Sequence, residues 1–229
     1  MKRLLLIILP LFLSVGLSQQ IIHTETYENG NIKNITYHKK TRYKIEKVKF
    51  VKYYENGQKK SEETYKNGKL DGLGTYWYEN GQMKSKGTTE DWRYDGLEDG
   101  LVTLWYDNGQ KYFEGTYKDG KLDGLGTWWY ENGQKEEEGT YKNGEKDGLW
   151  YKWYENGQKK QEGTYKDNIP DGEYKCWNKD GGVIYETEFV NGTGVLIEFS
   201  ENEQMGEEMI YKNGEIIEFK FFELNYNKD

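Results

Sequence analysis

Cysteine, proline and apolar residues are scarce in this sequence, and each shortage narrows the possible structures. The 229 residues include one cysteine, Cys176, so no disulfide can form within the chain. We expect that lone thiol to fill a packing gap in a strand rather than to act as a nucleophile. Only 34% of the residues are hydrophobic and 31% are charged, which leaves too little apolar surface for a thick central core.

Aromatic residues are abundant, and they argue against a disordered chain. They make up 16% of the sequence, with 21 Tyr and 8 Trp against two prolines. Tyr and Trp favour strands and bury a large area per residue. The chain after its N-terminal segment has no apolar period of the helical kind, so helices are not expected. The composition therefore favours a thin β structure held together by aromatic side chains.

The N-terminus has the pattern of a secretory signal peptide. Lys2 and Arg3 precede an apolar stretch at residues 4–13, and Gly-Leu-Ser at 16–18 offers a cleavage site before Gln19. The alternative is a membrane anchor, but the apolar stretch, even if it is extended to Leu17, is shorter than the ~20 residues that a spanning helix needs. We expect an exported protein (periplasmic, cell-surface or secreted) with no integral membrane segment after cleavage.

Negative charge predominates. The net charge is -8, and it falls to -10 without residues 1–18, which hold Lys2 and Arg3. Binding to nucleic acid depends on many Lys and Arg side chains that neutralise phosphates, so a nucleic-acid partner is not expected. Residues 31–60 are an exception, because Lys and Arg greatly outnumber Glu there. These cations fit solvated strand edges, and they also fit a patch for an anionic partner.

A tetrapeptide, Glu-Asn-Gly-Gln, repeats along the middle of the chain. It occurs at residues 55–58, 79–82, 131–134 and 155–158, with an Asp-Asn-Gly-Gln variant at 107–110. The intervals between successive copies are equal except for the one between 79–82 and 107–110, which is longer. The longer interval contains residues 91–100, where we expect about four extra residues to form a loop without ending the repeat.

A second motif, Tyr-Lys followed by Asn-Gly or a close variant, lies between these copies. Its tyrosines include Tyr117, Tyr141 and Tyr165, and one tryptophan takes the same place in each unit: Trp77, Trp105, Trp129, Trp153 and Trp177. Such periodicity indicates a repeat array. The expected organisation is a signal peptide at 1–18, a degenerate repeat or cap at 19–49, regular hairpin repeats at 50–178, degenerate repeats with a capping strand at 179–224, and a tail at 225–229.

Asn-Gly between two strand-like segments predicts a β-hairpin. A two-residue type I′ turn needs positive φ at both central residues, and Asn and Gly adopt it at low cost. With such a turn at 132–133, Gly126 would lie opposite Gly139. Trp128, Tyr130 and Tyr141 would then share one face, and Leu125, Thr127 and Trp129 the other. Neighbouring rings could fold over the paired glycines.

The predicted fold is all-β: an elongated antiparallel meander of hairpins in a single layer, with no central globular core. The segment from Glu114 to Gly133, Glu-Gly-Thr-Tyr-Lys-Asp-Gly-Lys-Leu-Asp-Gly-Leu-Gly-Thr-Trp-Trp-Tyr-Glu-Asn-Gly, resembles the MORN repeat (membrane occupation and recognition nexus). It is similar to the bacterial variant found in YwqK-family antitoxins. One departure is Trp150, which replaces the second glycine of a Gly-x-Gly pair. The resemblance implies a sheet that serves as an interaction scaffold.

Residues that could carry chemistry are few. His23 and His38 are the only histidines, and neither has a metal-ligand pattern around it. The sequence contains no nucleophile or phosphate-loop motif, and its acidic runs are typical of a solvated face. We therefore expect no catalytic, cofactor-binding or metal-binding residue, and no enzymatic activity.

Two functions remain open. The first is an exported scaffold that binds another protein, with an antitoxin or immunity role as a subclass, because repeat arrays offer extended surfaces rather than pockets. The second is a cell-wall or glycan-binding module, because the aromatic rows resemble the Trp/Tyr/Gly repeats of choline- and glucan-binding proteins. The candidate binding or packing residues are Trp77, Trp105, Trp129, Trp153, Trp177, Tyr117, Tyr141 and Tyr165. Exposed rings would favour the glycan, and buried rings the scaffold.

Overall fold

The computed structural model describes residues 19–71, 74–87, 99–200 and 205–223, and strands are the only regular elements there. The predictions for 1–18, 91–98 and 225–229 lie outside the described residues. The chain divides into two compact units, Met1–Gln110 and Lys111–Asp229. Within the described ranges no helix is long and apolar enough to cross a membrane.

The strands follow one another in chain order. Those of the first unit are β1 (Gln19–Thr26), β2 (Ile32–Lys40), β3 (Ile45–Tyr53), β4 (Lys59–Lys66), β5 (Lys69–Leu70), β6 (Gly74–Trp77), β7 (Met83–Gly87) and β8 (Gly100–Trp105). Those of the second unit are β9 (Lys111–Lys118), β10 (Lys121–Trp129), β11 (Lys135–Lys142), β12 (Glu145–Trp153), β13 (Lys159–Lys166), β14 (Ile169–Trp177), β15 (Val183–Phe189), β16 (Gly194–Phe199), β17 (Met205–Lys212) and β18 (Glu215–Glu223).

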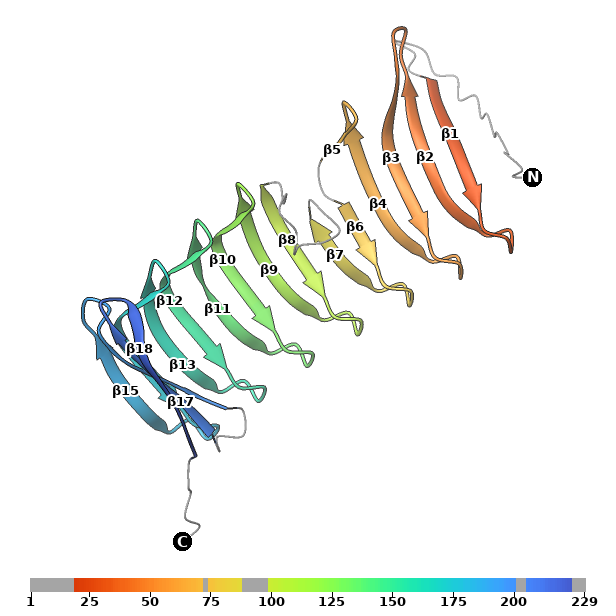
Figure 1. Ribbon diagram of the computed structural model, residues 1–229. Coiled ribbons are helices and arrows are strands. Elements are labelled where there is room, and N and C mark those ends of the chain that lie inside the picture. Colours follow the sequence, from red (N-terminus) through yellow and green to blue (C-terminus); the bar gives the residue numbers. More distant parts are fainter. Residues whose placement is uncertain (1–18, 72–73, 88–98, 201–204, 224–229) are drawn as a thin grey trace. The chain divides into compact units, whose positions relative to one another are not determined.

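These strands form a long antiparallel meander, as the sequence predicted (Figure 1). Strands β1 to β15 make a 15-stranded sheet in sequential order, with β5 paired only to β4, and the sheet does not close. Strands β16, β17 and β18 make a separate three-stranded sheet. The predicted all-β array of hairpins is therefore confirmed.

The two kinds of turn differ, and only one matches the prediction. At the Asn143-Gly144 turn both residues have positive φ, 53° and 86°, as a two-residue type I′ turn requires. The Asn132-Gly133 turn is longer: the N–H of Tyr130 bonds to the carbonyl of Gln134, and only Gly133 has positive φ. This three-residue loop, with glycine in the left-handed region, contradicts the predicted two-residue turn there.

The predicted register survives the longer turn. Gly126 lies opposite Gly139, because an irregularity between Trp128 and Trp129 restores the pairing that a two-residue turn would have given. Aromatic rings cover these glycines, as expected: a Cβ on Gly126 would lie 3.0 Å from the ring of Trp128, and one on Gly139 would lie 2.2 Å from the ring of Trp150. The substitution of glycine by Trp150 therefore supplies a ring that covers its neighbour.

A polar ladder joins successive repeats along the Glu-Asn-Gly-Gln turns. The phenol of Tyr130 donates a hydrogen bond to the carbonyl of Trp153 (2.8 Å), and the amide of Asn132 donates one to the carbonyl of Glu155 (2.8 Å). The same pair of bonds starts from Tyr54 and Asn56, from Tyr78 and Asn80, and from Tyr154 and Asn156. Each of these turns is thus fastened to the next, and a thin sheet gains cohesion from local bonds.

In the second unit the β16–β18 sheet packs on one face of the meander, an addition that the sequence did not predict. The contact holds a core whose buried members are Trp150, Tyr165, Tyr174, Cys176, Phe189, Leu196 and Phe199. A strand does form near the C-terminal end of the described residues, β18, but it belongs to this second sheet. We call the covered side of the second unit's strands the core face and their opposite side the tryptophan face; in the first unit, the tryptophan face is the side of its strands that carries Trp77 and Trp105.

Candidate interaction surface

The tryptophan face carries the tryptophan of each repeat. Leu125, Thr127 and Trp129 alternate along β10, so they share this face, while Trp128 between them lies on the core face with Tyr141. All five predicted tryptophans are half-buried, so they form neither an open platform nor a closed core. The exposure test proposed from the sequence therefore does not by itself separate the two functions.

In four of the repeats a lysine lies over the tryptophan ring. The ammonium lies 5.0 Å from the ring centroid for Lys59 and Trp77, 5.3 Å for Lys111 and Trp129, 5.6 Å for Lys135 and Trp153, and 5.2 Å for Lys159 and Trp177. These distances fit cation–π attraction, which contributes roughly 0.5–1 kcal/mol at exposed sites.

The same lysines pair with a glutamate further along their own strand. The Nζ–Oε2 distances are 2.8 Å for Lys59 and Glu62, 2.7 Å for Lys111 and Glu114, 2.5 Å for Lys135 and Glu138, and 2.6 Å for Lys159 and Glu162. Each glutamate orients its lysine toward the tryptophan. The tryptophan face therefore repeats one unit of an aromatic ring, a cation and an anion, which we call the Lys–Glu–Trp triad.

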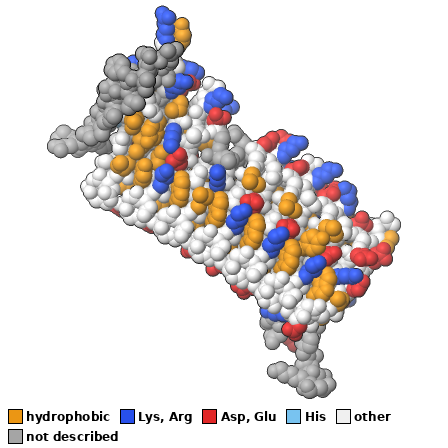
Figure 2. Space-filling view, turned by 180° about the vertical axis from the view of Figure 1, so that it is seen from behind, with side chains coloured by type: hydrophobic (Ala, Val, Ile, Leu, Met, Phe, Trp, Pro, Cys, Tyr) orange, Lys and Arg blue, Asp and Glu red, His pale blue; other side chains and the backbone are white. Residues whose placement is uncertain are grey.

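In the second unit, the exposed Leu125 and Leu149 form a second row on this face, and Leu101 of the first unit takes the same place in its own repeat. Leu101, Leu125 and Leu149 take the same place in successive repeats and are 50%, 54% and 50% exposed. Each stands an even number of positions before the tryptophan of its own strand and so points to the same side. Figure 2 shows one face of the molecule, where hydrophobic and Lys side chains alternate in rows with acidic side chains beside them. Repeated apolar side chains in the open are typical of an interaction surface.

The predicted tyrosines lie on the core face, away from the tryptophans. The ring of Tyr141 is 4.9 Å from that of Trp150, and Tyr165 is 6.2 Å from Trp150 on its other side. Burial raises the pKa of Tyr117 and Tyr165, and burial with the carboxylate of Glu137 raises the pKa of Tyr141 to about 12. These tyrosines serve packing between repeats.

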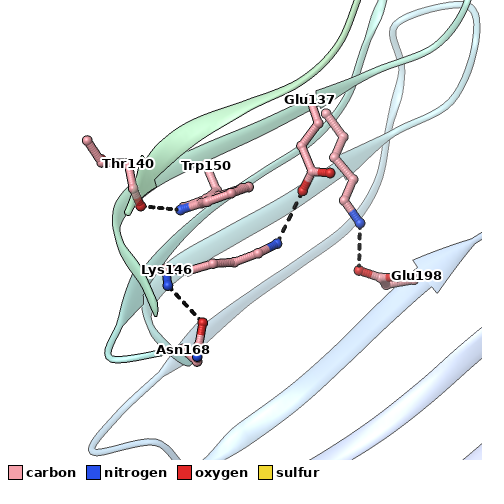
Figure 3. A network of polar contacts seen from close by, with 7 residues as sticks. Glu137, Thr140, Lys146, Trp150, Asn168 and Glu198 are labelled. Atoms are coloured by element: carbon pink, nitrogen blue, oxygen red, sulfur yellow. Dashed lines mark hydrogen bonds and ion pairs between the residues drawn. The ribbon is translucent and has the colours of Figure 1, made fainter. Parts of the chain in front are cut away.

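A polar network crosses the core face beside Trp150 (Figure 3). The ammonium of Lys146 lies 3.9 Å from the Trp150 ring centroid and 3.2 Å from Glu137 Oε1, and the indole N–H of Trp150 donates to the carbonyl of Thr140 at 3.1 Å. These polar groups satisfy one another, so the network fixes the ring of Trp150 in place.

One ion pair links the two sheets. Lys152 Nζ on the meander lies 3.1 Å from Glu198 Oε1 on β16. Burial lowers the pKa of Lys152, but the carboxylates of Glu198 and Glu137 outweigh it and leave that pKa raised. Cys176 beside them is buried, its thiol contacts the carbonyl of Ile197 at 3.4 Å, and burial raises its pKa to about 12. It packs as a neutral thiol, in agreement with the packing role expected of it.

The basic segment at 31–60 makes contacts within the first unit. Lys47 lies 3.6 Å from the ring centroid of Tyr65, and Lys49 pairs with Glu62 at 2.6 Å. Lys44 pairs with Glu46 at 2.5 Å. The strands of this segment, β2, β3 and the start of β4, are each paired on both sides, so these lysines lie on interior strands and the predicted strand-edge role is not supported.

The sequence reasoning missed the leucine row and the turn ladder. Both features leave a pattern in the sequence. A leucine stands at 101, 125 and 149, at the regular interval of the repeat, and a tyrosine stands directly before each copy of the turn tetrapeptide. Over the described ranges, no group of three or more His, Cys, Asp or Glu side chains is arranged to hold a metal ion.

Fold and surface together define a class, an antiparallel β-hairpin repeat protein with periodic surface rows. The MORN repeat variant model matches residues 48–67, 98–119, 122–143, 146–167 and 170–191. The MORN repeat model matches residues 64–83 and 138–149. The chain is therefore a MORN-repeat protein, in agreement with the family resemblance found in its sequence.

Other comparisons add little. No curated protein matches the chain significantly. Among solved structures, it is similar to a crystal structure of a protein of unknown function from Bacteroides fragilis, at 11% identity over 75% of this chain and 93% of that one. The TM-score of 0.16 is too low for that likeness to bear on fold or function.

Proposed function

We propose that this protein is an exported, non-enzymatic MORN-repeat scaffold that binds a protein partner along its tryptophan face. One observation carries the proposal: the Lys–Glu–Trp triad recurs with the repeat beside a row of half-exposed leucines. Aromatic anchors with apolar neighbours and satisfied charges are the usual elements of protein interfaces.

The periodicity suits an extended partner. Within the second unit, successive triads are two strands apart, which corresponds to about 9.5 Å at the ordinary strand spacing. A partner segment laid across the strands would meet the same arrangement at each step, so weak contacts would add through multivalency. An antitoxin or immunity role would be one form of such binding.

Glycan binding is the alternative, and two features favour the protein partner over it. A sugar that stacks on a tryptophan needs a free ring face, but Trp129 and Trp153 each carry an ammonium close to the ring. The exposed leucines at 125 and 149 offer apolar contact to a protein side chain and none of the polar groups that orient a sugar.

The test is a quantitative pull-down from cell-envelope and whole-cell extracts, with the chain from Gln19 onward as bait. A bait with Trp129→Ala, Leu149→Ala and Trp153→Ala should lose the partner that the unchanged bait retains. A matched control with Lys118→Ala and Lys142→Ala, exposed at the far ends of their strands, should retain it.

The outcomes separate the alternatives. Equal recovery by both variant baits would overturn the assignment to the tryptophan face. Recovery of insoluble wall material only, released by free sugar or choline, would replace the protein partner with a glycan. Export is tested separately, by the mass of the protein recovered outside the cytoplasm, whose first residue should be Gln19.

A further inference from the structure

Strand β18 is an open edge with exposed apolar side chains. Among the described residues it pairs with β17 alone, so one side of its backbone has free N–H and C=O groups. Its exposed hydrophobic residues are Ile216 (52%), Ile217 (59%), Phe219 (47%) and Phe221 (64%). Soluble proteins usually protect such edges with charge, proline or a covering element, because an open apolar edge invites another strand.

We propose that β18 pairs with the β18 strand of a second copy of this chain, antiparallel about a two-fold axis through Phe219. The joined sheet would combine the three-stranded sheets of both copies. A two-fold interface uses the same patch on both subunits, so the strand must be complementary to itself when it is reversed. The sequence of β18, Glu-Ile-Ile-Glu-Phe-Lys-Phe-Phe-Glu, meets that condition in one register.

The charges select this register. With Phe219 on the axis, Lys220 lies opposite the partner subunit's Glu218, and Glu218 lies opposite the partner subunit's Lys220. A shift of the axis to residue 218 would oppose two glutamates, and a shift to 220 would oppose two lysines. Opposite charges that face each other across strands stabilise a pair, and like charges destabilise it. An axis that passes between two residues, for example between 218 and 219, is excluded because the residues placed opposite each other would then have side chains on different faces of the sheet.

The apolar side chains fit the same register. The two copies of Phe219 meet at the axis, and Ile217, the extra residue of a β-bulge against β17, lies beside the partner subunit's Phe221. The rings of Phe219 and Phe221 already contact each other at 4.8 Å between centroids, so each copy presents an assembled aromatic pair. These rings and the two copies of Ile217 would cover the centre of the interface, where apolar cross-strand pairs are most favourable.

Lys220 and Glu218, at the centre of the proposed interface, are exposed enough to pair with the second copy as well as within their own chain. Lys220 lies 2.9 Å from Glu218 and 3.7 Å from Glu208, and the side chains of Lys220 and Glu218 are 53% and 50% exposed. On pairing, both copies of Lys220 and of Glu218 would form one alternating cluster. The like-charged pair of Glu215 and Glu223 falls at the two ends of the ladder, where both side chains are exposed to solvent.

The first experiment measures the oligomeric state by sedimentation across a range of concentrations, with the chain from Gln19 onward. The unchanged chain should dimerise. Lys220→Glu or Glu218→Lys alone should weaken dimerisation at least tenfold, because each opposes like charges twice. The double variant Glu218→Lys/Lys220→Glu should restore it, since the opposed pairs are again Lys with Glu. Lys118→Glu, exposed on β9, is the control and should leave it unchanged.

The second experiment tests the register with disulfides. Phe219→Cys should give a crosslinked dimer on mild oxidation, because opposed residues of an antiparallel pair lie within disulfide range. Ile216→Cys should not, since its opposite number is residue 222. Cys176 is buried and should not interfere. A chain that stays monomeric at every concentration, a dimer unaffected by the charge reversals, or equal crosslinking at 216 and 219 would each overturn the proposal.

Discussion

The phenol of Tyr154 donates a hydrogen bond to the backbone carbonyl of Trp177, 2.9 Å away and one repeat further along the chain. Tyr154 has no exposed surface, so the bond is shielded from water. The same bond recurs from Tyr54, Tyr78 and Tyr130. In a sheet with little core, these bonds are a main source of cohesion between repeats.

Tyr154→Phe should lower the free energy of unfolding by about 1–2 kcal/mol, because it removes one bond and leaves the carbonyl of Trp177 without its partner. The urea midpoint of the transition followed by circular dichroism measures the change. Tyr43→Phe, at a side chain that is 88% exposed, is the control and should leave the midpoint unchanged. An unchanged midpoint for Tyr154→Phe would show that the ladder contributes little.

Gly139→Ala should destabilise the second unit by about 1–3 kcal/mol, because a Cβ there would lie 2.2 Å from a carbon of the Trp150 ring. The same substitution in a Trp150→Leu background should cost much less, since the smaller side chain leaves room. A double-mutant cycle measured by urea unfolding gives the coupling. Additive effects would contradict the view that the ring and the glycine are matched.

Leu196→Ala should lower the free energy of unfolding by about 2–5 kcal/mol, because Leu196 is only 4% exposed between the two sheets of the second unit. Val183→Ala, at a residue that is 56% exposed, should change it by less than about 0.5 kcal/mol. Thermal unfolding checks both. If the two variants lost equal stability, the β16–β18 sheet would not be packed on the meander as described.

Alkaline pH should weaken the fold through Cys176. Burial and the nearby Glu198 carboxylate raise its pKa from 9.0 to about 12, so the folded thiol keeps its proton while the unfolded one loses it. The unfolded state therefore binds fewer protons between these values, and stability falls as the pH rises from 9.0 toward 12.

The measurement is the urea midpoint of the unchanged chain and of Cys176→Ala, below pH 9.0 and at a pH inside that window. Cys176→Ala should lose less stability on going to the higher pH. Some loss will remain, because Tyr141 also has a raised pKa, from 10.0 to about 12. The native thiol should also resist a thiol reagent until urea unfolds the chain. Rapid reaction of the folded protein would contradict its burial.

The repeat and its hairpins follow from the sequence alone, because these features depend on residues close together in the chain. Asn143 and Gly144 adopt positive φ at low cost, so their turn could be read directly. The pairing of Gly126 with Gly139 followed from strand lengths and alternation. The two-residue turn predicted at 132–133 is wrong, because a hydrogen bond from Tyr130 to Gln134 closes a longer loop. The predicted register is nevertheless correct, because an irregularity in the strand pairing beyond the loop compensates for the extra residue.

The placement of the chain after Phe189 depends on tertiary packing and could not be predicted from the sequence. Lys152 and Glu198 are far apart in the sequence, and no repeat or turn motif links them. Their pairing depends on the fit of one sheet on another, with Leu196 filling space beside Cys176 and Trp150.

The tryptophan face was decided in the same way. The sequence placed a tryptophan in every repeat, but the lysine over four of the rings belongs to a paired strand, as with Lys111 on β9 and Trp129 on β10, and the two meet only once those strands have paired. Turns and hairpins are set by the backbone preferences of neighbouring residues. Contacts between strands and between sheets depend on how side chains pack, and those packing surfaces form only after the strands have paired.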